Sequence, residues 1–268
     1  MTTSLTLTKH HGLGNDFLVV FHPHVEDLPA LARRLCDRRR GIGADGLLVA
    51  ESAQRQAAQM VLYNADGSRA EMSGNGIRCF AQALATVRRR ADTELRILTD
   101  AGERLVTMRP TEDPATIEAS VDMGPVETLA EPAGWAALGT YPDRPVAHLG
   151  LGNPHSVVGV DDVAAVDLLA LGAKVPSVNL EVIEPGPEPH AITMRVHERG
   201  AGITAACGTG ACAAAWAAAQ WGLVPAGASE IVVHMDGGSA KVALHRPVTG
   251  SVTLTGPATY VGTVEIPR

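Results

Sequence analysis

Two stretches of the chain, SGNGIRCFAQALA (residues 73–85) and CGTGACAAAWAAA (residues 207–219), share one layout. Each begins with a small side chain that can carry a proton, continues with a Gly-polar-Gly turn, and enters an alanine-rich segment that predicts a helix. Their first residues, Ser73 and Cys207, lie 134 positions apart in a chain of 268. A spacing of half the chain predicts two similar halves, each with one dominant helix.

The segments between these helices predict many short strands, whereas a parallel βαβ series would need more helices. We therefore expect an α+β fold with two similar lobes, with the boundary in the proline-containing region 124–135. The expected helices are 28–39, 74–89 and 208–221, and the expected strands are 5–9, 17–21, 47–50, 60–63, 95–98, 104–108, 115–121, 147–149, 156–160, 177–183, 191–197, 231–235, 239–244, 251–255 and 263–266.

Composition excludes several classes of function. The chain has a net charge of −7 and only 3% aromatic residues, which argues against a nucleic-acid surface and against stacking platforms for bases. No apolar stretch is long enough to span a bilayer, and the first residues do not resemble an export signal. The four cysteines follow neither a disulfide framework nor a zinc pattern, so we expect reduced thiols and a cytoplasmic location.

Two other patterns have a simple structural interpretation. The stretch GIGADG (residues 41–46) matches GxGxxG, but a basic helix precedes it and a strand follows it, the reverse of a dinucleotide site. We interpret it as a tight turn. The histidines at 10, 11, 22 and 24 have no cysteine or carboxylate at a spacing that completes a ligand set, so we expect no metal.

The paired loops suit chemistry on a carbon beside a carboxylate. A helix N-terminus presents backbone N–H groups and the positive end of a dipole, which hold a carboxylate and lower the pKa of a nearby thiol. If the two halves face each other, Ser73 and Cys207 address opposite faces of one carbon, as racemisation requires. Cys207 has a second interpretation, because a cysteine just before a helix is often an inert buried thiol. Cys79 and Cys212 lie inside the two expected helices, and we expect them to be core residues.

Six blocks, in the same order as in the family, resemble diaminopimelate epimerase over nearly the whole chain. They are HHGLGNDF (10–17), GIGADGLL (41–48), YNADGSRAEMSGNGIRCF (63–80), LGNPHSVV (151–158), VNLEVI (178–183) and VHERGAGITAACGTGACAAA (196–215). The resemblance implies an isomerase that interconverts LL- and meso-diaminopimelate for lysine and peptidoglycan synthesis, with no pyridoxal cofactor and no metal. It also implies two pseudo-symmetric lobes, each a β-barrel-like sheet around a central helix, here 1–122 with 259–268, and 123–258.

The resemblance also assigns roles to individual residues. Cys207 and position 73 match the catalytic acid/base pair, and His155 and Glu198 match residues that assist it. The expected partner is diaminopimelate, with no nucleic acid and no membrane; a homodimer is left open. The substrate-binding positions are Asn15, Asn64, Gly74, Asn75, Asn153, Asn179, Glu198, Arg199, Gly208 and Thr209, of which Gly74, Asn75, Gly208 and Thr209 offer backbone N–H groups to the reacting carboxylate.

The chain departs from the family pattern at two positions. The first catalytic cysteine of the family is Ser73 here, and a glutamate of the family is Ile203. A serine hydroxyl is a far weaker acid than a thiol of pKa about 8.5, so it is rarely ionised and acts poorly as a base. We therefore expect slow epimerisation with intact binding. Because a catalyst leaves the equilibrium between isomers unchanged, both directions must slow together.

The sequence leaves two alternatives open. One is a related amino acid racemase or hydroxy-amino-acid dehydratase, because a hydroxyl in place of a thiol can favour protonation of a leaving group. The other is an inactive homologue that still binds the substrate.

Overall fold

The computed structural model describes residues 4–88, 94–139, 144–245 and 250–267, and these residues form two compact units. The first unit comprises Met1–Val121 with Gly256–Arg268, and the second comprises Asp122–Thr255. The division falls within the strands β8 (Thr116–Pro125) and β17 (Ser251–Pro267), so each of these strands contributes residues to both units. No helix among the described residues is long and apolar enough to cross a membrane.

Eight strands of the first unit pair into a closed ring. Antiparallel pairs join β17 to β1, β1 to β2, β3 to β4, β6 to β7 and β7 to β8, while β2–β3 and β4–β6 are parallel. The pairing of β8 with β17 closes the ring. Its remaining strands are β1 (Ser4–Gly12), β2 (Asn15–Phe21), β3 (Gly46–Glu51), β4 (Ala58–Asn64), β6 (Glu94–Thr99) and β7 (Gly102–Pro110), and the short β5 (Arg69–Ala70) pairs with β4.

The second unit repeats this order of strands and pairings. Antiparallel pairs join β10 to β11, β12 to β13, β15 to β16 and β16 to β17, while β11–β12 and β13–β15 are parallel. At the other end of this series, β9 pairs with β10. These strands are β9 (Glu127–Thr128), β10 (Val146–Gly150), β11 (Pro154–Gly159), β12 (Asn179–Pro185), β13 (Ala191–Glu198), β15 (Glu230–Met235) and β16 (Gly238–Leu244), and β14 (Gly202–Thr204) pairs with β13 as β5 does with β4.

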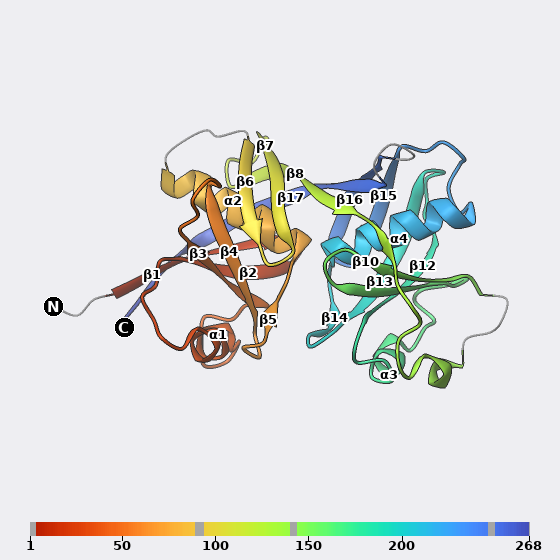
Figure 1. Ribbon diagram of the computed structural model, residues 1–268, viewed down its shortest axis with the longest axis horizontal. Helices are drawn as coiled ribbons and strands as arrows, with labels where there is room; N and C mark the ends of the chain where they lie inside the picture. Colours follow the sequence, from red (N-terminus) through yellow and green to blue (C-terminus); the bar gives the residue numbers. More distant parts are fainter. Residues whose placement is uncertain (1–3, 89–93, 140–143, 246–249, 268) are drawn as a thin grey trace. The chain divides into compact units, whose positions relative to one another are not determined.

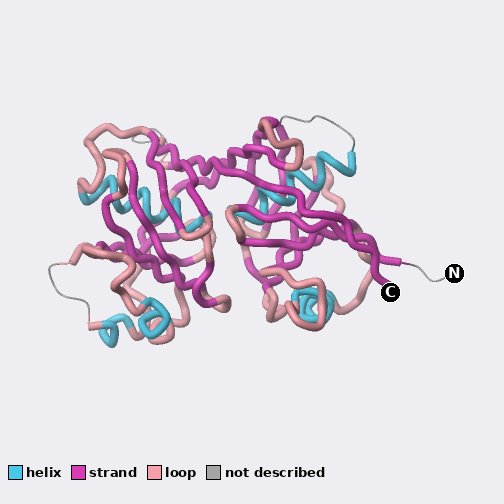
Figure 2. The backbone as a smooth tube through the Cα atoms, turned by 180° about the vertical axis from the view of Figure 1, so that it is seen from behind, coloured by secondary structure: helices cyan, strands magenta, loops and turns pink. Residues whose placement is uncertain are grey.

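One long helix runs through each ring of strands (Figures 1 and 2). Helix α2 (Gly74–Arg88) is buried along its first eleven residues, and α4 (Gly208–Trp221) is buried on nearly every side. Alanine has the highest helix propensity and a small side chain, so an alanine-rich helix forms readily and fits inside a closed sheet. Gly222, with φ of 72°, ends α4 in the left-handed conformation. The predicted α+β fold with two pseudo-symmetric lobes is confirmed.

Two shorter helices lie outside the rings and cover apolar sheet surface (Figure 1). Helix α1 (Leu28–Cys36) packs Leu31 and Leu35 onto the first ring, and its N-cap Asp27 accepts a hydrogen bond from Ala30. Helix α3 (Leu168–Gly172) takes the equivalent place between β11 and β12 and packs with the 3₁₀ turn η1 (Trp135–Leu138). Neither α3 nor η1 was expected, because such short segments lack a helical period.

The principal difference from the expected strands is at the C-terminus. We expected strands at 251–255 and 263–266, but β17 is one strand of seventeen residues that continues through Gly256 and Pro257. The expected helix 74–89 matches α2 up to Arg88, and residue 89 lies outside the described residues. The GIGADG stretch is a turn, as expected, in which Gly43 has a φ of 82°.

Candidate active site

Ser73 occupies the N-cap position of helix α2. Its Oγ accepts a hydrogen bond from the Gly76 amide at 3.0 Å, and its carbonyl accepts the first helical bond, from Ile77. Serine is among the best N-cap residues because its oxygen satisfies one of the amide groups left without a partner inside the helix. This hydrogen bond orients the side chain and leaves the hydroxyl proton available to a further acceptor.

The asparagines predicted near Ser73 belong to a polar network. The Asn75 amide nitrogen donates to Asn15 Oδ1 at 3.1 Å, and the Asn15 amide nitrogen donates to Asp45 Oδ2 at 2.7 Å. Asn64 ends β4 in register with Gly46, next to Asp45, and donates its side-chain N–H to Ser68 at 3.0 Å. The structure thus joins Asn15 to Asn75 by a direct hydrogen bond. Asn64 lies on β4, which pairs with β3, the strand that begins directly after Asp45.

A buried arginine fixes the first turn of α2. The side chain of Arg78 is fully buried and donates to Asn75 Oδ1 at 2.8 Å, to the Gly74 carbonyl at 3.1 Å and to the Pro257 carbonyl at 3.3 Å. Three acceptors at fixed positions suit the rigid fork of a guanidinium group. The Arg78 charge therefore lies within the helix turn that begins with Gly74.

Cys207 is the N-cap of α4 and repeats the geometry of Ser73. The Gly210 amide donates to Cys207 Sγ at 3.3 Å, and the Ala211 amide donates to its carbonyl at 2.9 Å. The Thr209 hydroxyl lies 3.5 Å from the sulfur. The amides of Gly208 and Thr209 precede the first helical hydrogen bond, so they are the groups that a helix N-terminus offers to an anion.

The expectation of a lowered pKa for Cys207 is wrong. Burial raises the pKa of the thiol well above its ordinary value of 9.0, and the negative charges of Glu198 and Glu181 raise it further. The hydrogen bonds from Thr209 and Gly210 act in the opposite direction and are outweighed. A helix N-terminus favours a thiolate, but two carboxylates and the loss of water around the sulfur oppose it. Cys207 is therefore a thiol at neutral pH.

Burial also raises the pKa of the Glu198 carboxyl, while contacts with Thr204 and Cys207 lower it. Glu198 ends β13, and its Oε1 accepts a hydrogen bond from the Thr204 hydroxyl. A carboxyl with a raised pKa beside a thiol with a raised pKa is suited to exchanging a proton with it.

His155 lies on β11 and connects to the start of α4 through two polar side chains. Its Nε2 is 2.9 Å from Asn153 Oδ1, and the Asn153 amide nitrogen donates to Thr209 Oγ1 at 3.3 Å. Its Nδ1 lies 2.6 Å from Oε1 of Glu181, a buried residue of β12. Sequence reasoning missed Glu181; the signal was a single charged residue inside an apolar strand sequence.

Asn179 positions the turn that carries Arg199. Its Oδ1 accepts a hydrogen bond from the Arg199 amide at 2.8 Å, and its side-chain N–H donates to the Pro154 carbonyl at 3.2 Å. Arg199 itself is exposed. Ile203, where the family has glutamate, is an exposed apolar residue of β14 opposite His197.

The predicted site residues therefore fall into two groups, one in each unit. The first unit holds Asn15, Asn64, Ser73, Gly74 and Asn75. The second unit holds Asn153, His155, Asn179, Glu198, Arg199, Cys207, Gly208 and Thr209. Cys79 and Cys212 are fully buried inside α2 and α4 and belong to the core. Among the residues that the structure describes, no group of three or more His, Cys, Asp or Glu side chains is placed to hold a metal ion.

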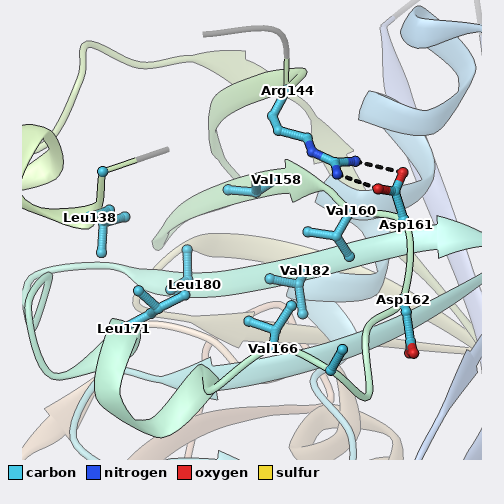
Figure 3. Close-up of a pocket in the computed structure, with 12 residues that line it drawn as sticks. Leu138, Arg144, Val158, Val160, Asp161, Asp162, Val166, Leu171, Leu180 and Val182 are labelled. Carbon is cyan, nitrogen blue, oxygen red and sulfur yellow. Dashed lines mark hydrogen bonds and ion pairs between the residues drawn. The ribbon is translucent and has the colours of Figure 1, made fainter. Parts of the chain in front are cut away.

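A separate hollow of about 490 Å³ lies between β12 and α3 in the second unit (Figure 3). Apolar side chains such as Leu180 and Val182 line it, and an ion pair between Arg144 and Asp161 lies at its edge. None of the predicted site residues lines this hollow. The groups able to transfer protons are at the starts of α2 and α4 instead.

Comparison with known proteins identifies a family for this chain. A family model described as diaminopimelate epimerase matches residues 7–129 and 148–261. The diaminopimelate epimerase of Moorella thermoacetica is 38% identical over 282 residues, covering 97% of this chain and 98% of that protein. That of Thermosynechococcus vestitus is 37% identical over 292 residues, covering 98% and 100%.

Solved structures share the fold at low sequence identity. A predicted epimerase from Pseudomonas aeruginosa has a TM-score of 0.75 and 15% identity, with 98% of this chain and 99% of that chain covered. A hydroxyproline epimerase from Agrobacterium vitis has a TM-score of 0.72 and 14% identity, with 98% and 91% covered. A phenazine biosynthesis protein of Bacillus anthracis has a TM-score of 0.75 and 14% identity, with 99% and 100% covered. These likenesses show the fold alone.

Proposed function

Because this chain belongs to the diaminopimelate epimerase family, we propose that it interconverts LL- and meso-diaminopimelate as an isomerase that uses no pyridoxal cofactor. The observation that carries the proposal is the match to that family over nearly the whole chain. Both the family model and the individual relatives show this match. The start of α4 supports it with a thiol and helix amides in one turn, and the Glu198 carboxyl at the end of β13 interacts with that thiol. The racemase, dehydratase and inactive-homologue alternatives are not favoured by these comparisons.

We assign the two proton-transferring groups to the two N-cap residues. Cys207 acts on one face of the substrate α-carbon and Ser73 on the other. The reacting carboxylate is held by the amides of Gly74 and Asn75 at the start of α2, and of Gly208 and Thr209 at the start of α4. These dipoles stabilise the negative charge that develops when the α-proton leaves. Asn15, Asn64, Asn153, Asn179, Glu198 and Arg199 complete substrate binding, and their number suits a substrate with a second amino acid end.

The reaction requires one proton to leave and another to arrive. Glu198 accepts the proton of the Cys207 thiol, because burial raises the pKa of its carboxyl. The Cys207 thiolate then takes the α-proton, so that the C–H bond breaks and an S–H bond forms. The Ser73 hydroxyl donates its proton to the opposite face, so that its O–H bond breaks and a new C–H bond forms. The resulting alkoxide takes a proton from water, and Glu198 gives its proton to the hydroxide that forms, so that all three groups return to their starting states. Turnover is slow because the serine hydroxyl is too weak an acid to release its proton readily.

Incubation with LL-diaminopimelate in deuterated water tests this function. We expect deuterium at the α-carbon and formation of the meso isomer with no added cofactor. A hydroxylated amino acid that yields an unsaturated product would indicate a dehydratase instead. Tight binding of diaminopimelate with no exchange at high enzyme concentration would indicate an inactive homologue.

We also infer a cytoplasmic location, which the four free and buried cysteines support.

A further inference from the structure

A second carboxyl lies beneath the first turn of α4 and has no role in the reaction described above. The side chains of Glu181 and His155 are both fully buried, with Glu181 Oε1 2.6 Å from His155 Nδ1. The other carboxyl oxygen of Glu181, Oε2, has no hydrogen-bond partner within the described part of the chain. Burying a carboxyl with one oxygen unsatisfied costs stability, so this arrangement calls for an explanation other than packing.

From Glu181 a continuous line of polar atoms leads to the Cys207 sulfur. His155 Nε2 lies 2.9 Å from Asn153 Oδ1, and the Asn153 amide nitrogen donates to Thr209 Oγ1 at 3.3 Å. Thr209 Oγ1 lies 3.5 Å from Cys207 Sγ. Because Asn153 Oδ1 can only accept, His155 Nε2 must carry a hydrogen. One further proton is then shared between His155 Nδ1 and Glu181 Oε1.

The carboxyl is also close to the thiol in space. A Cβ atom placed on Gly210 would lie 2.6 Å from Glu181 Oε1 and 3.2 Å from Cys207 Sγ. The two groups therefore flank the same helix residue, and glycine is needed there because the carboxyl occupies the space of a side chain. This contact explains the second glycine of the Cys207-Gly208-Thr209-Gly210 loop.

The first unit shows that the fold does not require this charged pair. The tetrapeptide Gly-Leu-Gly-Asn ends at Asn15 and again at Asn153, which makes Phe17 the counterpart of His155. Phe17 pairs with Gly46 as His155 pairs with Asn179, so Leu48 is the counterpart of Glu181.

Packing gives the same correspondence. Leu48 Cδ2 is 3.4 Å from a Cβ placed on Gly76, the helix residue equivalent to Gly210. The apolar side chains of Phe17 and Leu48 thus occupy in the first unit the positions that His155 and Glu181 occupy in the second. Replacing a buried charged pair by apolar residues of similar volume is often neutral or stabilising, so the pair in the second unit calls for a functional reason.

We propose that Glu181 is a positioning residue for the proposed epimerase reaction: through His155, Asn153 and Thr209 it fixes the orientation and the protonation of Cys207. The inference rests on the function proposed above. The charged and titratable groups that face Cys207 are Glu181 on β12, Glu198 on β13 and His155 on β11. Burial raises the pKa of Glu181, and the Glu181 charge in turn raises the pKa of Cys207.

Glu181→Gln tests the proposal, because glutamine keeps the size of the side chain and can still donate to His155 Nδ1 while it cannot ionise. The first measurement is the titration of Cys207, followed by thiolate ultraviolet absorbance after subtraction of the same protein carrying Cys207→Ser. We expect Cys207 to titrate at lower pH in the Glu181→Gln protein than in the wild type. This measurement needs no substrate, so it tests the effect of Glu181 on Cys207 even if the proposed function is wrong.

The second measurement is the rate of α-deuterium exchange as a function of pH. We expect kcat to fall about 10- to 100-fold with little change in KM, and the pH profile to shift with the Cys207 titration. An unchanged Cys207 titration together with an unchanged pH profile would overturn the proposal. Loss of exchange in the wild type, with a shifted titration in the variant, would reject the proposed function and retain the role of Glu181.

A double variant separates positioning from folding. His155→Phe with Glu181→Leu copies the Phe17 and Leu48 pair of the first unit. We expect a folded protein with wild-type or higher thermal stability, a lowered Cys207 pKa and greatly reduced exchange. A protein that fails to fold, or loses several degrees of melting temperature, would show that the pair is structural and would contradict the proposal.

Discussion

The Gly76 amide donates a 3.0 Å hydrogen bond to the Ser73 oxygen, which caps helix α2 and leaves the hydroxyl proton available to another acceptor. The Gly210 amide makes the same contact with the Cys207 sulfur at 3.3 Å. The serine therefore has the position and orientation that a second thiol would have, and it lacks only the acidity.

Ser73→Cys is expected to raise kcat for epimerisation about 100-fold or more, because a general acid–base group with a pKa nearer the working pH contributes on that scale. The forward and reverse rates must rise by the same factor. Initial rates measured from LL- and from meso-diaminopimelate check both statements.

Ser73→Ala is the matched control. It is expected to abolish the remaining delivery of deuterium to the face of the α-carbon opposite Cys207. It is also expected to cost about 1 kcal/mol of stability through loss of the helix cap. Exchange at the wild-type rate in Ser73→Ala would show that the serine hydroxyl has no part in the reaction.

Alkaline pH is expected to destabilise the protein through its buried thiols. Burial raises the pKa of Cys36 and of Cys79 to about 12 from an ordinary value of 9.0. Above pH 9 the unfolded chain releases these protons while the folded protein keeps them, so the unfolded state binds fewer protons and stability falls as pH rises. Each thiol contributes a slope of about 1.4 kcal/mol per pH unit between these values.

Urea denaturation at several pH values above 9 measures this slope. Cys79→Ala should make it shallower by the contribution of one thiol, even though the variant starts from a lower stability because it leaves a small cavity. Parallel slopes for the two proteins would contradict the assignment of Cys79 as a thiol that stays protonated in the folded state.

Gly210→Ala is expected to be more harmful than Gly76→Ala, although the two glycines are equivalent helix residues. At Gly210 the new methyl group would lie 2.6 Å from a carboxyl oxygen that His155 holds in place, whereas at Gly76 the nearest atoms lie between 3.1 and 3.4 Å. We expect a difference of about 1 to 3 kcal/mol in unfolding free energy. Adding Glu181→Ala should recover much of the loss at Gly210, and strict additivity of the two changes would contradict this contact.

Arg78→Leu is expected to cost about 2 to 4 kcal/mol of stability, because two buried acceptors and one partly buried acceptor lose their donor. Arg78→Lys should recover only part of this loss, since one ammonium group does not have the fork of a guanidinium. Thermal melting of both variants measures the effect. A lysine variant as stable as the wild type would show that charge alone is required.

Much of the fold could be predicted because the two central helices carry local signals. The predicted helix 208–221 coincides with α4, since its alanines favour a helix and Gly222 ends it. The long β17 was predicted as two strands because Gly256 and Pro257 are typical of turns. Its pairing with several other strands overrides that local preference, and pairing of distant segments is not visible in a short window of sequence.

The site was less predictable than the fold, because its electrostatics depends on residues far apart in the chain. The motif around Cys207 indicates a helix N-terminus, from which we expected a lowered pKa. The opposing carboxylates come from Glu181 and Glu198, which the folded strands bring to the sulfur. The sequence signal for Glu181 was its place as a single charged residue in the apolar stretch VNLEVI (178–183).

The central claim is that Cys207 and Ser73 serve one stereogenic carbon, and deuterium incorporation tests it most directly. LL-diaminopimelate incubated in deuterated water should give meso product labelled at the inverted α-carbon, slowly with Ser73 and far faster with Ser73→Cys. Labelled meso product that forms at one rate in both proteins, or that fails to form in either, would contradict the account.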